Sequence, residues 1–362
     1  MVKAKEIAGL DCAMRAGDGI KLILRSRFEE MCSFSAAALD WSETEGVHDM
    51  RVASRRLRSV VKDFLPYLRR RKLRQAREDL RSVAQALGAV RDQDVALIAL
   101  EKLAEDAPPE LSTGVKQFAN SRQHKRGGAR SQLGEALSED ALKKLQQDFH
   151  DALEESLKGS RGANGDEQAI TDDAELHEIA REILDERLRD LDEMSTSLFQ
   201  PFETEHLHEM RIAAKRLRYA MELFTPCLGE ALKPFCKEIA RMQDSLGELH
   251  DCDVWIVEIG AALRKASDEK VAVKSPGDGL EESMLSNDST TRESETQIEH
   301  QAVFWLLDHF VKQRTEHFCA ALERWREWKT TGFQERLADT IHNQSLGVEP
   351  ISSAAKIIAN ES

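Results

Sequence analysis

A basic segment that occurs twice is the feature that most constrains this sequence. Val47–Leu68 reads VHDMRVASRRLRSVVKDFLPYL and Leu207–Leu228 reads LHEMRIAAKRLRYAMELFTPCL, so that His, Arg, Leu and Pro recur 160 residues apart. A second shared string follows each copy at an offset of 159 residues, LGAVRDQDV at Leu87–Val95 and LGELHDCDV at Leu246–Val254. Two strings in the same order at nearly one offset indicate a duplicated unit.

The length and composition suit a duplicated helical protein. At about 150 residues per domain, 362 residues correspond to two domains or one duplicated domain. Aromatic residues make up only 6% and charged residues 32%, which favours long surface-charged helices over sheets. Apolar residues recur at steps of three and four, and alternating strand-like runs are absent. The predicted fold class is therefore all-α.

Prolines and polar stretches divide the pattern into elements. We predict helices over 19–40, 46–65, 70–87, 92–104, 111–137 and 140–157 in the first half, and over 175–199, 205–223, 228–246, 251–265, 298–328 and 333–342 in the second. The predicted units are a first half over 18–158, a linker over 159–172, a second half over 173–330, and a C-terminal helix and tail over 331–362. The polar stretch 267–297 is expected to be a disordered loop.

Positive charge is concentrated in one part of an acidic chain. The formal net charge is −14, and a mean field of that sign repels polyanions. Arg51–Arg77 nevertheless holds eleven basic residues and a single acid, Asp63. The molecule is thus expected to be bipolar, with its acidity elsewhere.

The repeated basic residues share one face of a helix. At 100° per residue, the first copy places a cationic arc of roughly 80° beside an apolar arc of Met50, Ala53, Leu57, Val61 and Phe64. The second copy repeats the arrangement, except that Glu222 stands where Lys62 stood. The cationic arcs consist of His48, Arg51, Arg55, Arg58 and Lys62, and of His208, Arg211, Lys215 and Arg218. Like charges at this spacing repel by roughly 0.2–0.5 kcal/mol per pair, so an anionic ligand would stabilise them.

Simpler interpretations of these charges exist. A basic run is commonly a solvated face, and acids on adjacent helices are able to pair with it. Because the same positions are basic in both copies while neighbouring positions differ, we favour a binding role. Asp92, Asp94, Asp251 and Asp253 are interpreted as helix N-caps that also orient an arginine of the basic helix, with Gly88 and Gly247 in turns of positive φ.

The motif H-[DE]-M-R-[VI]-A-x-[RK]-R-L-R, followed by L-G-x-x-x-D-x-D-V and repeated in tandem, resembles the CHAD family, the conserved histidine α-helical domain. The resemblance covers roughly Asp18 to Trp328. It implies two four-helix-bundle units related by pseudo-twofold symmetry around a central basic groove that binds inorganic polyphosphate, and some members associate with polyphosphate granules. The ligand contacts that it implies are His48, Arg51, Arg55, Arg56, Arg58, His208, Arg211, Lys215, Arg216 and Arg218, with Lys62 matched in one half only.

The chemistry of these residues agrees with such a ligand. Polyphosphate has about one charge per phosphate and no base to recognise, and guanidinium groups donate paired hydrogen bonds to phosphate oxygens. The histidines are expected to donate to phosphate when protonated. Metal ligation is the alternative for them, although one His per copy is not a ligand set. We predict no cofactor and no metal.

Other functions fit the sequence less well than polyphosphate binding. No G-x-x-x-x-G-K-[ST] loop is present, and we expect no enzyme activity, with a metal-dependent phosphohydrolase as the less favoured alternative. Nucleic-acid binding is the main rival, but near the basic arcs only Tyr219 offers an aromatic stacking platform. A scaffold that docks an acidic partner on a granule is a third candidate.

The cysteines and the N-terminus suggest the compartment. The six cysteines are widely spaced without a C-x-x-C pair, and we interpret them as reduced buried thiols. The first residues contain no apolar signal region, and no run approaches the ~18 apolar residues of a membrane span. We therefore expect a cytoplasmic protein, associated with polyphosphate granules if it binds that polymer.

Overall fold

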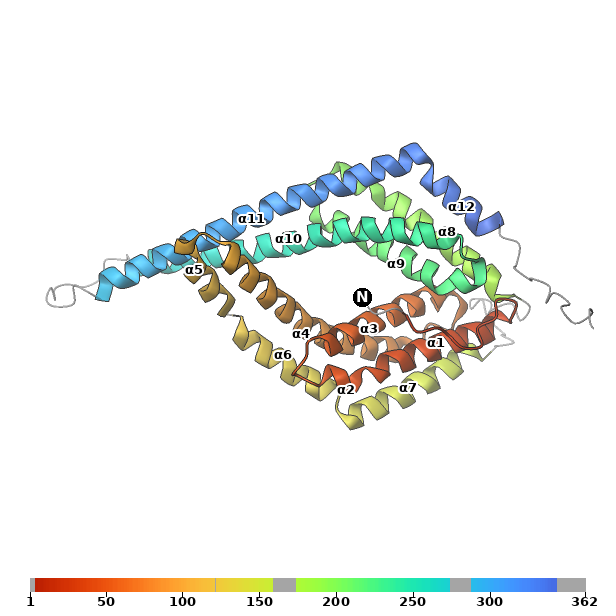
Figure 1. Cartoon of the computed structure of the whole chain (residues 1–362). Helices are drawn as coiled ribbons and strands as arrows, with labels where there is room; N and C mark the ends of the chain where they lie inside the picture. Colours follow the sequence, from red (N-terminus) through yellow and green to blue (C-terminus); the bar gives the residue numbers. More distant parts are fainter. Residues whose placement is uncertain (1–3, 121, 159–173, 274–287, 344–362) are drawn as a thin grey trace, which may run out of the picture.

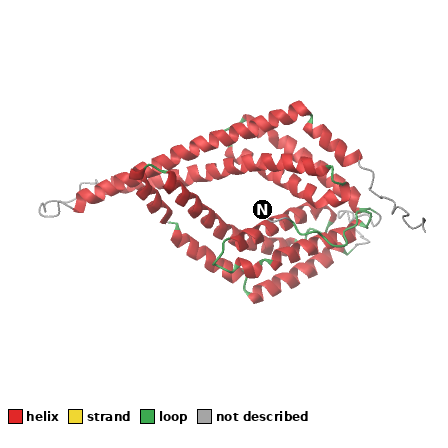
Figure 2. Cartoon of the chain, in the orientation of Figure 1, coloured by secondary structure: helices red, strands yellow, loops and turns green. Residues whose placement is uncertain are grey.

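The computed structural model describes residues 4–120, 122–158, 174–273 and 288–343, and its long elements are all helices (Figure 1; Figure 2). The predicted all-α class is confirmed. The helices are α1 (Ala16–Ser33), α2 (Ser35–Ala38), α3 (Glu45–Phe64), α4 (Arg74–Asp106), α5 (Pro109–Asn120), α6 (Gln123–Ala136), α7 (Glu139–Leu157), α8 (Leu176–Met194), α9 (Thr204–Leu228), α10 (Leu232–Val273), α11 (Asp288–Thr331) and α12 (Phe333–Asn343). Short 3-10 turns, η1 (Leu65–Tyr67) and η2 (Ser195–Phe199), follow α3 and α8.

The two repeated segments form α3 and α9, and their apolar arcs lie in one core. Met50, Leu57 and Phe64 of α3 are fully buried there, as are the equivalent residues of α9. Burying each such side chain stabilises the fold by roughly 1.5–3 kcal/mol. The rings of Phe64 and Phe224, which occupy the same position in the two repeats, meet edge to face with centroids 6.2 Å apart. This packing leaves the basic arcs outside the core.

A second apolar cluster joins the two halves at the far end of the molecule. Leu100 of α4 and Val115 of α5 pack with Ile259 of α10 and Leu306 of α11, and Figure 1 shows α5 beside α11 there. Next to this distal cluster, the side chain of Arg122 forms an ion pair with Glu258 and lies 4.6 Å above the ring of Trp255. The two halves therefore contact each other at two separate places.

The predicted breaks in α4 and α10 are wrong. Gly88 and Gly247 lie inside continuous helices, and neither is among the described glycines with positive φ. A glycine inside a helix costs only about 1 kcal/mol, and the buried neighbours Leu87 and Leu246 outweigh that cost. The aspartates that follow are consequently not N-caps.

Several predicted boundaries also shift. The helix expected over 111–137 is divided into α5 and α6, and α9 continues through Pro226 to end at Gly229, whose φ is 89°. The helices α10 and α11 extend into the loop predicted over 267–297, whose residues 274–287 lie outside the described part. The predicted linker 159–172 and most of the tail, 344–362, also lie outside it.

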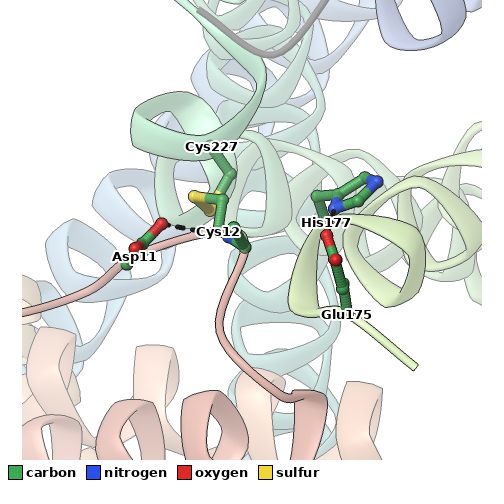
Figure 3. The surroundings of a disulfide bond; sticks show 6 residues. Asp11, Cys12, Glu175, His177 and Cys227 are labelled. Atoms are coloured by element: carbon green, nitrogen blue, oxygen red, sulfur yellow. Dashed lines mark hydrogen bonds and ion pairs between the residues drawn. A yellow bond between two sulfur atoms is a disulfide. The ribbon is translucent and has the colours of Figure 1, made fainter. Parts of the chain in front are cut away.

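The prediction that all cysteines are reduced is wrong for two of them. Cys12 and Cys227 form a disulfide with a Cα–Cα distance of 5.1 Å (Figure 3). We call residues 4–15 the N-terminal arm. Besides the disulfide, the arm pairs its backbone with the start of α8, where the amide of His177 donates to the carbonyl of Cys12 at 3.1 Å. Of the four free cysteines, only Cys252 is buried, and Cys319 is exposed.

Candidate functional site

The cationic arcs of the two repeats lie close together where α3 contacts α9. Burial lowers the pKa of Lys215, on α9, to about 7. Repulsion from Arg211 and Arg216 on the same helix adds to this shift, and so does repulsion from Arg55 and Arg58 on α3. Cations from both repeats therefore act on a single ammonium group.

A cavity of about 460 Å³ lies between α3, α4 and α9, and we call it the basic cavity. Its wall contains eight cationic side chains and one carboxylate, that of Glu78, which lies 3.8 Å from Arg74. The cations are Arg55, Arg58 and Lys62 of α3, Arg74, Arg77 and Arg81 of α4, and Lys215 and Arg216 of α9. Such a wall concentrates positive potential in one concave place.

The cations at the centre of this cavity lack anionic partners. Among the described residues, Arg55, Arg58 and Lys62 make no ion pair, and the buried Nε of Arg55 has no hydrogen-bond partner. Partial desolvation lowers the pKa of each of these three groups, although Arg58 and Lys62 stay exposed, and repulsion from Arg81 contributes at Arg58. Since an unpaired cation is costly to desolvate, a bound anion would stabilise this arrangement.

The first aspartate of each repeated string lies near an arginine in the N-terminal part of a basic helix. Asp92 accepts a hydrogen bond from Arg51 at 2.6 Å, so the expected pairing with an arginine of the basic helix is found for this residue. Asp251 lies near Arg211, and burial raises its pKa. The charges of Arg51 and Arg211 are therefore partly balanced by protein carboxylates.

The second aspartate of each string has a structural role. Asp94 is buried and pairs with Arg126 of α6 at 2.6 Å, and Asp253 pairs with Arg314 of α11 at the same distance. The two aspartates occupy equivalent positions in the sequence repeat, whereas their arginine partners do not. The Asp94 pair attaches α4 to α6, and the Asp253 pair attaches α10 to α11. Neither pair involves a cation of α3 or α9.

The histidines are neutral near pH 7 in the free protein. Burial and the charge of Arg91 lower the pKa of His48. Burial and the nearby His250 lower the pKa of His208 to about 4, and the two Nδ1 atoms are 3.1 Å apart. Within the described residues, no group of three or more His, Cys, Asp or Glu side chains is placed to hold a metal ion.

Arg56 and Arg218 lie in a different pocket from the other predicted contacts. Both are buried, and Arg218 pairs with Glu222 at 2.9 Å. Their pocket, of about 710 Å³, is walled on one side by residues of the N-terminal arm, and we call it the covered pocket. The predicted site residues therefore do not share one pocket: some line the basic cavity, Arg56 and Arg218 line the covered pocket, and Lys62 and Arg216 also line a neighbouring pocket.

Three arginines of the basic cavity were absent from the predicted site. Arg74, Arg77 and Arg81 extend from α4, outside the repeated motif, and all three are exposed. Their spacing of three and four residues places them on one face of the helix. The density of basic residues over 51–77 was the sequence signal that pointed to two of them.

The fold and the cavity define an all-helical protein with a cationic pocket at the junction of its halves. The sequence model of the CHAD domain family matches residues 22–260, and the chain belongs to this family. None of the helices in the described part of the chain combines the length and apolar composition needed to cross a membrane.

Two solved structures are similar in fold. The crystal structure of the CHAD domain from the plant Ricinus communis is 19% identical, covers 94% of this chain and 96% of its own, and has a TM-score of 0.57. PptA from Streptomyces chartreusis is 14% identical, covers 86% of this chain and 100% of its own, and has a TM-score of 0.58. A search of curated proteins found no significant match.

Proposed function

We propose that this protein binds inorganic polyphosphate in the basic cavity and does not hydrolyse it. The observation that carries the proposal is a wall of eight cations with one carboxylate in a chain of net charge −14. Arginine donors suit phosphate oxygens, and a cavity lined almost entirely by cations selects for charge density without requiring bases to recognise. The CHAD family, through the resemblance described above, implies the same ligand.

The electrostatic part of the proposal is tested by titration at several salt concentrations. By analogy with single-stranded nucleic acid, eight phosphate contacts give a slope of about −6 for log affinity against log salt. Fluorescently labelled long-chain polyphosphate is a suitable probe. A slope near zero would rule out binding by this cavity.

Competition separates the two leading ligand classes. Unlabelled polyphosphate and single-stranded DNA, matched in phosphate concentration, are added to the labelled complex. We expect polyphosphate to displace the probe at a much lower concentration, because the cavity wall contains no aromatic side chain on which a base would stack. Equal displacement by both would favour nucleic-acid binding.

The absence of catalysis and the compartment are parts of the same proposal. Incubation of the protein with polyphosphate should release no orthophosphate above the background rate.

We propose a cytoplasmic location on polyphosphate granules, to be checked by imaging a tagged protein in cells with and without the polymer. Disulfides are rare in the reducing cytoplasm, so alkylation of intact cells before gel analysis tests the proposed location through the state of the Cys12–Cys227 bond.

A further inference from the structure

The sequence repeat predicts two equivalent pockets, and the structure contains both. Aligned at the offsets of the repeat, Arg58 of the basic cavity corresponds to Arg218 of the covered pocket, and Arg216 corresponds to Arg56. The helices α4 and α10 align in the same way, since the buried residues Leu73 and Leu80 match the buried residues Leu232 and Ile239 at an offset of 159. The two pockets are thus counterparts in the repeat.

The covered pocket has lost the cations that distinguish its counterpart. Lys62 is replaced by Glu222, which neutralises Arg218. On α10, the positions that correspond to Arg77 and Arg81 are Cys236 and Ala240. Only Arg74 has a cationic counterpart there, Lys233, which forms an ion pair with Glu230. The three arginines that line the basic cavity from α4 are therefore not repeated in the wall that α10 gives to the covered pocket.

The N-terminal arm forms part of the wall of the covered pocket. The backbone amide of Lys5 donates to Glu30 at 2.8 Å, and Arg27 donates to the carbonyl of Lys5 at 2.8 Å. Ile7 is buried in the main core, and Cys12 ties the arm to Cys227. The arm is held by backbone bonds, an apolar anchor and a covalent bond.

From these observations we infer that the protein binds polyphosphate at only one of the two equivalent pockets, which we call one-sided binding. One polyphosphate polymer lies in the basic cavity and runs along Arg74, Arg77 and Arg81 of α4. The corresponding face of α10 binds no polyphosphate. This inference rests on the proposed function and assigns three further binding residues to it. The three arginines face the same cavity as Arg58 and Lys215, so a single flexible polyanion reaches all of them.

The test compares two triple variants that remove the same charge. Arg74→Gln, Arg77→Gln and Arg81→Gln are combined on α4, and Lys233→Gln, Lys237→Gln and Arg241→Gln on α10, where all three cations are also exposed on one helix face. The affinity for long-chain polyphosphate should fall at least tenfold in the α4 variant, with a salt slope shallower by about 2, since each lost phosphate contact removes roughly 0.7. The α10 variant should change less than twofold.

The outcomes separate this inference from the proposed function. Equal losses in both variants would mean that only net charge matters, and an unchanged α4 variant would remove these arginines from the site; either result overturns one-sided binding while leaving polyphosphate binding intact. If the unmodified protein binds no polyphosphate, the proposed function itself fails. Calorimetry with a short chain of about eight phosphates, one for each cation of the wall, should give one site per molecule, and two sites would contradict the inference.

Discussion

The basic cavity and the covered pocket arise from the same repeated sequence, yet their chemistry has diverged. In the basic cavity Arg58 is exposed and has no ion pair among the described residues, whereas its counterpart Arg218 is buried beside Glu222. The difference follows from a few substitutions on α9 and α10 and from an arm that lines only the covered pocket. A repeated motif therefore specifies the position of a charge on a helix. The neighbouring residues determine whether that charge is free to contact a ligand or forms an ion pair within the protein.

The largest expected effect contrasts Arg218→Glu with Arg58→Glu. The first change places a second carboxylate beside Glu222 in a buried site, and breaking a buried pair in this way costs about 3–5 kcal/mol of folding free energy. Polyphosphate affinity below the unfolding temperature should stay nearly unchanged. Thermal unfolding and a binding titration, made on the same samples, check both statements.

Arg58→Glu should give the opposite result. The side chain is exposed, so stability changes by less than about 0.5 kcal/mol. Losing a charge-assisted bond to phosphate costs about 2–3 kcal/mol, a loss of affinity of roughly thirtyfold to 150-fold. If the two variants showed the same phenotype, the contrast between the pockets would be invalid.

The disulfide belongs to the covered side, and its removal should affect stability without affecting binding. Cys12→Ser removes a bond that closes a long loop, which typically costs 2–5 kcal/mol. We expect a lower Tm and an unchanged affinity for polyphosphate. Cys319→Ser, at an exposed free cysteine, is the matched control. A loss of affinity in the Cys12 variant would show that the arm shapes the basic cavity as well.

Protonation of Lys215 should make binding depend on pH. Its pKa is about 7 in the free protein because of burial and of repulsion from Arg211, Arg216, Arg55 and Arg58, and its cavity also contains the cations of α4 and Glu78. Polyphosphate favours the charged form and raises this pKa. Affinity is therefore greatest below pH 7 and should fall by about tenfold, 1.4 kcal/mol, as the pH rises from 7 to 9.

Lys215→Arg is the control for this pH dependence. A guanidinium stays charged over the whole range, so the affinity of the variant should not change between pH 7 and pH 9. Comparable losses in the variant and the parent protein would assign the pH dependence to another group.

The smallest expected effect concerns the histidines. Burial holds His48 and His208 neutral at pH 7, so neither provides a cation there. His48→Gln and His208→Gln, which keep a polar side chain, should each change the affinity less than threefold, or about 0.6 kcal/mol. A tenfold loss would show that bound phosphate protonates the imidazole, and the loss should then grow as the pH is lowered.

Local pattern was enough to predict the helices that form the cavity. The apolar arcs of α3 and α9 are buried where the periodicity placed them, because residues at positions i, i+3 and i+4 share one face of a helix. Ile212 is the exception, since it is half-buried and lines the basic cavity. The same geometry separates Arg56 from Arg58, since positions two apart point about 200° from each other. Arg56 thus faces the covered pocket, although the motif includes both residues.

Features that depend on distant parts of the chain were not predictable in this way. Cys12 and Cys227 are 215 residues apart, and no local signal pairs them. Gly88 looks like a helix end in isolation, but tertiary packing carries α4 through it. Arg81 joins the cavity only because α4 folds back beside α3, which is a fact of packing rather than of sequence spacing.

The unbroken course of α4 has a mechanical consequence. At 1.5 Å per residue, its 33 residues form a rod of roughly 50 Å without a hinge. One end carries the cations of the basic cavity, and the other is fixed in the distal cluster beside the contact of Arg122 with Glu258. Because packing holds both ends of this one helix, the basic cavity and the distal cluster are kept at a fixed separation.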